Sequence, residues 1–153
     1  MIAWKCAPFA ELSPREIHDL YQARVGVFVL EQKCAFQDVD GADPECWHLL
    51  GRKTATSPGP LIAYARLVPP GLKFPEPSIG RVLTTSGARR SGAGRELMRE
   101  AVGRVRGMWP GRPIRIGAQQ YLERFYGEFG FVQVSEPYDE DGIPHIEMLR
   151  AAG

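Results

Sequence analysis

The chain has 153 residues, of which 44% are hydrophobic and 24% are charged, and its formal net charge is +1. This length suits one domain, so we expect residues 1–153 to share a single core. The near-neutral charge disfavours a general role in binding nucleic acid or acidic membranes, which would need a local basic patch. No apolar run is long enough to span a membrane, no signal peptide is recognisable, and the cysteines are widely spaced, which predicts a cytoplasmic protein.

The first part of the chain predicts a strand followed by helical structure. Residues 2–6 favour the strand, and Ser13 and Glu16 match a capping box, which satisfies two backbone donors at the start of a helix. The apolar run 25–30 continues the helical pattern, and we expect it to form a second helix bent at Gly26.

The rest of the chain alternates between strand and helix patterns. These segments are predicted in the order strand, strand, strand, helix, strand, helix, strand, strand, over residues 46–53, 61–68, 78–85, 92–109, 113–118, 120–130, 131–136 and 145–149. The fold class is therefore α/β, with a mixed, mostly antiparallel central sheet and helices on both faces. Residues 78–85 are expected to form a central strand, and a ligand site is expected beyond its carboxyl end.

The junction ARRSGAGREL, residues 88–97, combines exposed backbone with positive charge where a strand gives way to a helix. A helix start offers unpaired N–H groups that suit phosphate, and Gly92 and Gly94 remove side chains that would keep an anion away. Positive charge is added by Arg89, Arg90 and Arg95. The junction indicates a pyrophosphate site, although a plain helix start with surface arginines remains an alternative.

Two familiar nucleotide loops do not fit this junction. A Walker loop continues with Lys and Ser or Thr, where this chain has Arg95 and Glu96. The dinucleotide fingerprint requires a third glycine, where this chain has Leu97. Neither of these phosphate ligands is therefore expected.

The spacing Arg89-x-x-Gly92-x-Gly94 resembles the acyl-CoA-binding signature of the GCN5-related N-acetyltransferase (GNAT) superfamily. The run from Tyr126 to Phe131 resembles a second signature of that family, on a helix that leads into a strand. Further segments resemble its ElaA-like branch in order: VFVLEQKCAFQDVDGAD, WHLLG, AYARL, IGRV, GAQ, FYGEFGF and YDEDGIPHIEM. The resemblance covers nearly the whole chain.

The resemblance implies a GNAT-like fold and acetyl-CoA as cosubstrate, with no metal. It implies that the loop amides hold the CoA pyrophosphate and that a strand splayed from its neighbour receives the pantetheine arm. Gln119 lies two helical turns before Tyr126, so both can face the same side. The implied cofactor-binding residues are Val82, Leu83, Thr84, Arg89, Arg90, Ser91, Gly92, Ala93, Gly94, Arg95, Gln119 and Tyr126.

Transfer of an acetyl group to an amine needs a neutral amine, a donor for the oxyanion and a proton for the departing thiolate. By the family match, Tyr126 is the candidate acid, although its spacing also suits core packing. Glu31 and His145 are alternative bases, and a water relay using neither is also open. His48 is expected to be a hydrogen-bonded residue of its strand.

The acidic run 37–45 lacks the spacing of a calcium loop, and its neighbouring cysteines lack zinc spacing. We expect either a solvated loop or an anionic rim that recruits a cationic amine.

The leading functional hypothesis is an N-acetyltransferase that moves an acetyl group to a primary amine of a small molecule, peptide or protein, in a ternary complex. One alternative is transfer of a longer acyl chain, because VGVFVLEQ resembles acyl-homoserine-lactone synthases. Another is a CoA-binding module without turnover. No nucleic-acid or membrane partner is expected. The sequence does not indicate the acceptor or the oligomeric state.

Overall fold

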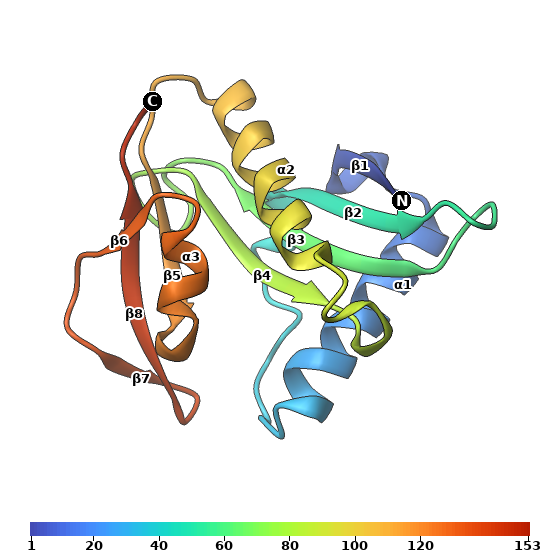
Figure 1. Cartoon of the computed structure of the whole chain (residues 1–153), viewed down its shortest axis with the longest axis horizontal. Coiled ribbons are helices and arrows are strands. Elements are labelled where there is room, and N and C mark those ends of the chain that lie inside the picture. Colours follow the sequence, from blue (N-terminus) through green and yellow to red (C-terminus); the bar gives the residue numbers. More distant parts are fainter.

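Two β-sheets make up the framework in a computed structural model that describes residues 1–153 (Figure 1). The first sheet is antiparallel throughout, and its strands lie in the order β1 (Ile2–Pro8), β2 (Trp47–Lys53), β3 (Leu61–Val68) and β4 (Ser78–Thr84). In the second sheet, β8 (Ile143–Arg150) pairs antiparallel with β5 (Ile114–Gln119), β6 (Phe131–Gln133) and β7 (Tyr138–Glu140). The predicted mixed α/β class and the predicted element order are confirmed.

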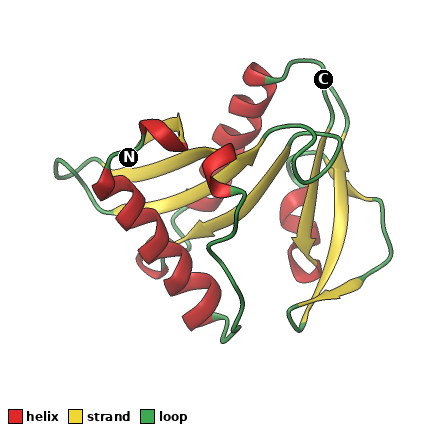
Figure 2. Ribbon diagram, turned by 180° about the vertical axis from the view of Figure 1, so that it is seen from behind, coloured by secondary structure: helices red, strands yellow, loops and turns green.

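Helices α1 (Pro14–Arg24) and α2 (Ala93–Met108) cover opposite faces of the first sheet (Figures 1 and 2). Successive strand residues point to opposite faces, so neighbouring residues enter different cores. Leu49 packs in the larger core with Leu97 of α2, whereas Leu50 packs in the smaller core with Leu20 of α1. The larger core also joins the two sheets and receives Tyr126 from α3 (Glu123–Gly127).

The start of α1 forms the predicted capping box. The Ser13 hydroxyl accepts from the Glu16 amide at 3.1 Å, and the Glu16 carboxylate accepts from the Ser13 amide at 2.8 Å. The apolar run does not form a separate helix. It continues α1 directly as a π-helical segment, Val25–Glu31. Just after this segment, the Gln32 side chain accepts a hydrogen bond from Gln119 of β5 at 3.2 Å. No helix of the chain is both long enough and apolar enough to cross a membrane.

Strands β4 and β5 run in the same direction and separate from one another (Figure 1). At their start, the Arg115 amide donates to the Pro77 carbonyl at 3.1 Å, but the two strands form no ladder beyond that point. The prediction of a central strand at 78–85 was therefore only partly right, because β4 is the edge of its own sheet. The backbone groups on that edge lack a strand partner.

An extra residue in β4 interrupts its pairing with β3. Tyr64 lies opposite Leu83, but Arg66 lies opposite Gly80, which leaves one residue too many in β4. Arg81 lies at this bulge with a left-handed φ of 51°. Such bulges bend a strand and redirect its side chains. Here the bulge precedes Val82, Leu83 and Thr84, the residues on the open edge.

Candidate active site

A cavity of about 550 Å³ occupies the space between the diverging ends of β4 and β5. Its walls come from the π-helical segment and the loop after it, from β4, from the end of β5, from the region of α3, and from the β7–β8 hairpin. The lining residues are Val27, Phe28, Glu31, Gln32, Cys34, Phe36, Ile79, Gly80, Arg81, Val82, Leu83, Thr84, Arg89, Ile116, Gly117, Gln119, Tyr121, Leu122, Tyr126, Glu140, Asp141, Ile143 and His145.

The first turn of α2 presents free backbone donors beside this cavity. Gly92 is the N-cap and has a φ of 86°, a left-handed conformation that favours glycine. The first bond within the helix runs from the Glu96 amide to the Gly92 carbonyl at 3.1 Å, so the amides of residues 93–95 remain unpaired. A Cβ on Gly94 would lie 4.0 Å from the Thr84 side chain, so the helix start adjoins a residue that lines the cavity.

The three arginines of the junction have different surroundings. Arg89 folds back over β4, where its Nη2 donates to the Glu31 carboxylate at 2.6 Å and to the Thr84 carbonyl at 3.0 Å. Arg95 pairs with Glu128 at 3.0 Å, and Arg90 is exposed and pairs with no carboxylate. The Ser91 hydroxyl donates to the Ala88 carbonyl. Of the junction residues, only Arg89 lines the cavity, and the others lie at the helix start beside it.

Tyr126 lies on α3 with only 7% of its surface exposed. Its ring packs edge-on against Phe125 and Phe131, whereas its hydroxyl hydrogen-bonds no protein group although the residue lines the cavity. Burial raises the pKa of Tyr126 well above its ordinary value, so its hydroxyl stays protonated near neutral pH. The side chain is thus a core residue that also lines the cavity, with its hydroxyl protonated.

Gln119 is not on the helix of Tyr126, so the two-turn argument was wrong. The segment after β5 begins with a 3-10 turn, Gln120–Leu122, and α3 starts only at residue 123. Gln119 is the last residue of β5 and lies directly opposite His145 of β8. Its amide donates to the Gln32 side chain at 3.2 Å. Gln119 and Tyr126 nevertheless line the same cavity.

His145 is 8% exposed and has a defined tautomer. Its Nδ1 lies 2.8 Å from the Ile143 carbonyl, which can only accept, so Nδ1 carries the hydrogen. The other nitrogen, Nε2, lies 3.3 Å from the Glu140 carboxylate. In the neutral ring, Nε2 therefore carries the lone pair and lies beside the Glu140 carboxylate.

His48 lies away from the cavity and is completely buried. Its Nε2 donates to the Asp43 carbonyl at 3.0 Å, and its Nδ1 accepts from the Tyr64 hydroxyl at 2.7 Å. Burial lowers the pKa of His48. The expectation of a hydrogen-bonded strand histidine is confirmed.

The acidic run is neither a solvated loop nor a rim of the cavity. Asp38 and Asp43 are 4% and 1% exposed and face inward. They pair with Arg24 at 3.0 and 2.8 Å, and further pairs join this aspartate cluster to Arg66 and Arg81. Burial alone would raise the pKa of Asp40, but hydrogen bonding and charge from Arg66 outweigh burial and lower it to about 2.

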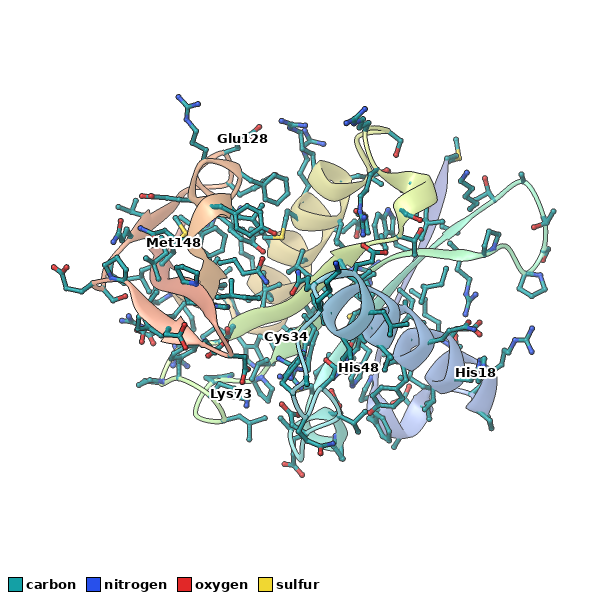
Figure 3. All side chains as sticks on the ribbon, turned by 90° about the horizontal axis from the view of Figure 1, so that it is seen from below. His18, Cys34, His48, Lys73, Glu128 and Met148 are labelled. Carbon is teal, nitrogen blue, oxygen red and sulfur yellow. The ribbon has the colours of Figure 1, made fainter.

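Several cavity residues were not predicted from the sequence, among them Cys34, Glu140 and Asp141. The Cys34 thiol donates to the Asp141 carbonyl at 3.4 Å, so the loop after the π-helical segment meets the β7–β8 turn across the cavity. Figure 3 shows Cys34 between the N-terminal helix and the C-terminal strands. One signal in the sequence could have indicated Glu140 and Asp141: they lie in the acidic turn just before the predicted strand that holds His145. The residues of a hairpin turn lie close to the strands that the turn joins.

Known proteins resemble the whole chain. A UPF0039 protein of Synechocystis is 43% identical over 148 residues, covering 97% of this chain and 94% of that protein. Protein ElaA of Escherichia coli is 40% identical over 152 residues, covering 98% and 97%. Its crystal structure superposes with a TM-score of 0.89 and covers 98% of this chain and 99% of that chain.

A second solved structure, an acyl-CoA N-acyltransferase from Pseudomonas aeruginosa, is 41% identical with a TM-score of 0.91, covering 99% of this chain and 100% of that one. The AHL synthase LasI, at 12% identity and a TM-score of 0.77, shares the fold alone. A model of the acetyltransferase (GNAT) domain matches residues 57–151. The chain therefore belongs to the GNAT acetyltransferase family, as an ElaA-like member with an acyl-CoA N-acyltransferase fold.

Proposed function

We propose that the chain transfers an acetyl group from acetyl-CoA to a primary amine by direct attack, with both substrates bound together. One continuous surface carries this proposal. It runs from the free amides of residues 93–95, past Thr84, into the cavity that Tyr126 and His145 line. It offers anion-binding groups at one end and proton-transfer groups at the other.

The start of α2 fits the pyrophosphate of CoA. Unpaired amides at a helix N-terminus bind phosphate well. Arg90 adds a guanidinium that no carboxylate neutralises. At Gly94 an added Cβ would make only ordinary contacts at 3.7 Å or more, so the protein's own packing does not require glycine there. A ligand lying against the backbone would require it.

The open edge of β4 fits the pantetheine arm. Because this strand has no ladder partner on the side of β5, the backbone groups that Val82, Leu83 and Thr84 turn toward that side are available to the amides of the arm, apart from the Thr84 carbonyl that Arg89 holds. An amide from the same edge can bind the thioester oxygen, whose negative charge increases during attack. The bulge at Arg81 sets the direction in which this edge faces.

Proton transfer is divided between two residues that face the cavity. An alkylamine has a pKa of about 10.4, so the acceptor must lose a proton before its nitrogen attacks the acetyl carbon. We assign this proton to Nε2 of His145, because Nδ1 is already protonated and Glu140 stabilises the cation. As the C–S bond breaks, the Tyr126 hydroxyl donates its proton to the thiolate, and the nitrogen, which must lose a second proton to become a neutral amide, returns that proton to the Tyr126 oxygen. The products are the amide and free CoA.

Glu31 is better suited to holding Arg89 than to accepting a proton. Its carboxylate oxygen lies 2.6 Å from the Arg89 guanidinium, so the carboxylate is already engaged in an ion pair. We therefore place Glu31 outside the proton-transfer steps.

Release of free thiol from acetyl-CoA, measured against a panel of primary amines, tests the function. Direct attack predicts initial velocities that fit a ternary-complex rate law and no acetylated protein by mass spectrometry. Cys34 is the cysteine that lines the cavity, so it is the thiol that could carry a covalent acetyl group. Direct attack needs no such intermediate, and a Cys34→Ala variant should therefore retain turnover. Failure to bind acetyl-CoA would overturn the proposal. Binding without thiol release would indicate a CoA-binding module, and faster turnover with long-chain acyl-CoA would indicate the longer-chain activity.

A further inference from the structure

The charges around the cavity are divided between its two ends. The basic junction lies at the start of α2, whereas the stretch from Phe131 to Leu149 contains no lysine or arginine. That stretch carries the acidic β7–β8 hairpin, with Asp139, Glu140 and Asp141, and Glu136 just before it. An approaching ligand with a positive charge is therefore attracted to the hairpin end.

Glu140 and Asp141 keep their negative charge at the cavity. Both line it, and neither pairs with a lysine or an arginine. The other charged lining residues are already neutralised, because Glu31 pairs with Arg89, and Arg81 pairs with Asp38 at 2.9 Å. The uncompensated negative charge is thus confined to the wall beside His145.

A separate observation indicates that this cavity is made for a polar ligand. Tyr126 is more than nine-tenths buried, and its hydroxyl has no protein partner although the residue lines the cavity. The hydroxyl oxygen itself is not fully enclosed, because the one enclosed side-chain nitrogen or oxygen without a partner is Nε of Arg66, so a polar ligand in the cavity can hydrogen-bond it.

The acceptor end of the cavity is narrow. The Cys34 thiol touches the Asp141 carbonyl at 3.4 Å, so the two walls meet at this end. Phe28 and Phe36 supply apolar surface in the same cavity. An aliphatic chain can pack against these rings while a cationic group on it meets the acidic hairpin.

On the basis of the proposed function, we infer that the acceptor is a linear aliphatic diamine or polyamine. Its reacting amine lies beside His145 and Glu140, its methylene chain packs against the aromatic residues, and its second ammonium group pairs with Asp141, the carboxylate of this wall that has no cationic neighbour. The second charge explains an acidic wall that amine deprotonation alone does not require.

The test compares 1,4-diaminobutane, butylamine, 4-aminobutyrate and a lysine-containing peptide in the thiol-release assay. We expect kcat/KM for the diamine to exceed that for butylamine about 10-fold, the effect of one charged hydrogen bond, and 4-aminobutyrate to be poorer still. The ratio of diamine to butylamine should fall as ionic strength rises, because salt screens exposed charges.

Asp141→Asn should lower kcat/KM for the diamine about 10-fold and leave butylamine unchanged. Asparagine suits this position, where φ is 53°, because it tolerates left-handed backbone. The matched control is Glu136→Gln, which removes the same charge from the segment just before the hairpin, at a residue outside the cavity, and it should leave both amines unchanged.

Equal kcat/KM for the diamine and butylamine, with no response of their ratio to salt, overturns this inference while leaving the acetyltransferase proposal intact. Preference for the lysine peptide does the same. Absence of thiol release with every amine overturns both.

Discussion

The carboxylate of Glu31 and the guanidinium of Arg89 lie 2.6 Å apart and join the segment after α1 to the start of α2. Arg89 also donates to the Thr84 carbonyl at the end of β4. This arrangement commits the guanidinium to the protein, although Arg89 belongs to the motif for which we propose CoA binding. On that proposal, an interaction of CoA with Arg89 competes with the Glu31–Arg89 pair.

Glu31→Gln should release Arg89 and tighten CoA binding, by at most about five-fold because exposed ion pairs are weak. Isothermal titration calorimetry measures the dissociation constant. Glu100→Gln breaks a comparable exposed pair with Arg104 inside α2 and should leave it unchanged. The turnover number should change little, and a loss of about 100-fold would identify Glu31 as the base instead.

Tyr126→Phe should lower kcat about 100-fold or more, because general acids contribute roughly that factor. The dissociation constant of CoA should stay the same, since the ring packing against Phe125 and Phe131 does not need the hydroxyl. Stopped-flow or steady-state thiol release measures kcat. Tyr121→Phe, at an exposed tyrosine that also lines the cavity, is the matched control and should retain full activity. An unchanged kcat for Tyr126→Phe would remove it from proton transfer.

Local patterns were sufficient to predict most elements of the fold. The capping box at Ser13 depends on residues three positions apart, and the two-faced strands depend on alternation, so both can be recognised in sequence. The strand-to-helix position of Gly92 was predictable for the same reason. Gln119 was misplaced because the helical pattern of α3 was extended back through a 3-10 turn.

Long-range pairings were not predictable from the sequence. The run 37–45 has the composition of a surface loop, yet its aspartates are buried by arginines at positions 24, 66 and 81. Similarly, β4 and β5 diverge because no ladder of backbone hydrogen bonds joins them, and no residue pattern in the sequence indicates that the ladder is absent. The cavity therefore had to be seen in three dimensions, and the acidic wall at Glu140 and Asp141 became visible only with it.

The buried guanidinium of Arg24 should be essential for stability. It pairs with Asp38 and Asp43 and is itself 0% exposed, so Arg24→Met would leave two buried carboxylates without this partner. We expect a loss of about 3–5 kcal/mol in the free energy of unfolding, the usual cost of breaking a buried pair from one side. Urea denaturation measures it. Arg104→Met, at an exposed pair on α2, should cost far less, and equal losses in the two variants would contradict this role.

The stability of the fold should decrease as pH falls from 7.5 to 5.5, because of His48. Burial lowers the pKa of His48 in the folded state, whereas the unfolded chain binds a proton near the ordinary value of 6.5. The unfolded state thus holds more protons in this range, and the free energy of unfolding declines by at most about 1.4 kcal/mol per pH unit. Asp40 contributes only at lower pH, because its pKa is about 2.

His48→Gln isolates this contribution. Urea denaturation at both pH values should show a smaller pH dependence in the variant than in the unmodified chain. His18→Gln, at an exposed histidine on α1, should keep the original dependence. If His48→Gln and the unmodified chain lose the same stability between pH 7.5 and 5.5, His48 is not the group that titrates. Because the Tyr64 hydroxyl donates to Nδ1 and the Asp43 carbonyl accepts from Nε2–H, protonation of Nδ1 would force the Tyr64 hydroxyl to accept instead of donate. It would also place a positive charge on a completely buried ring, and this burial is the main physical origin of the expected loss.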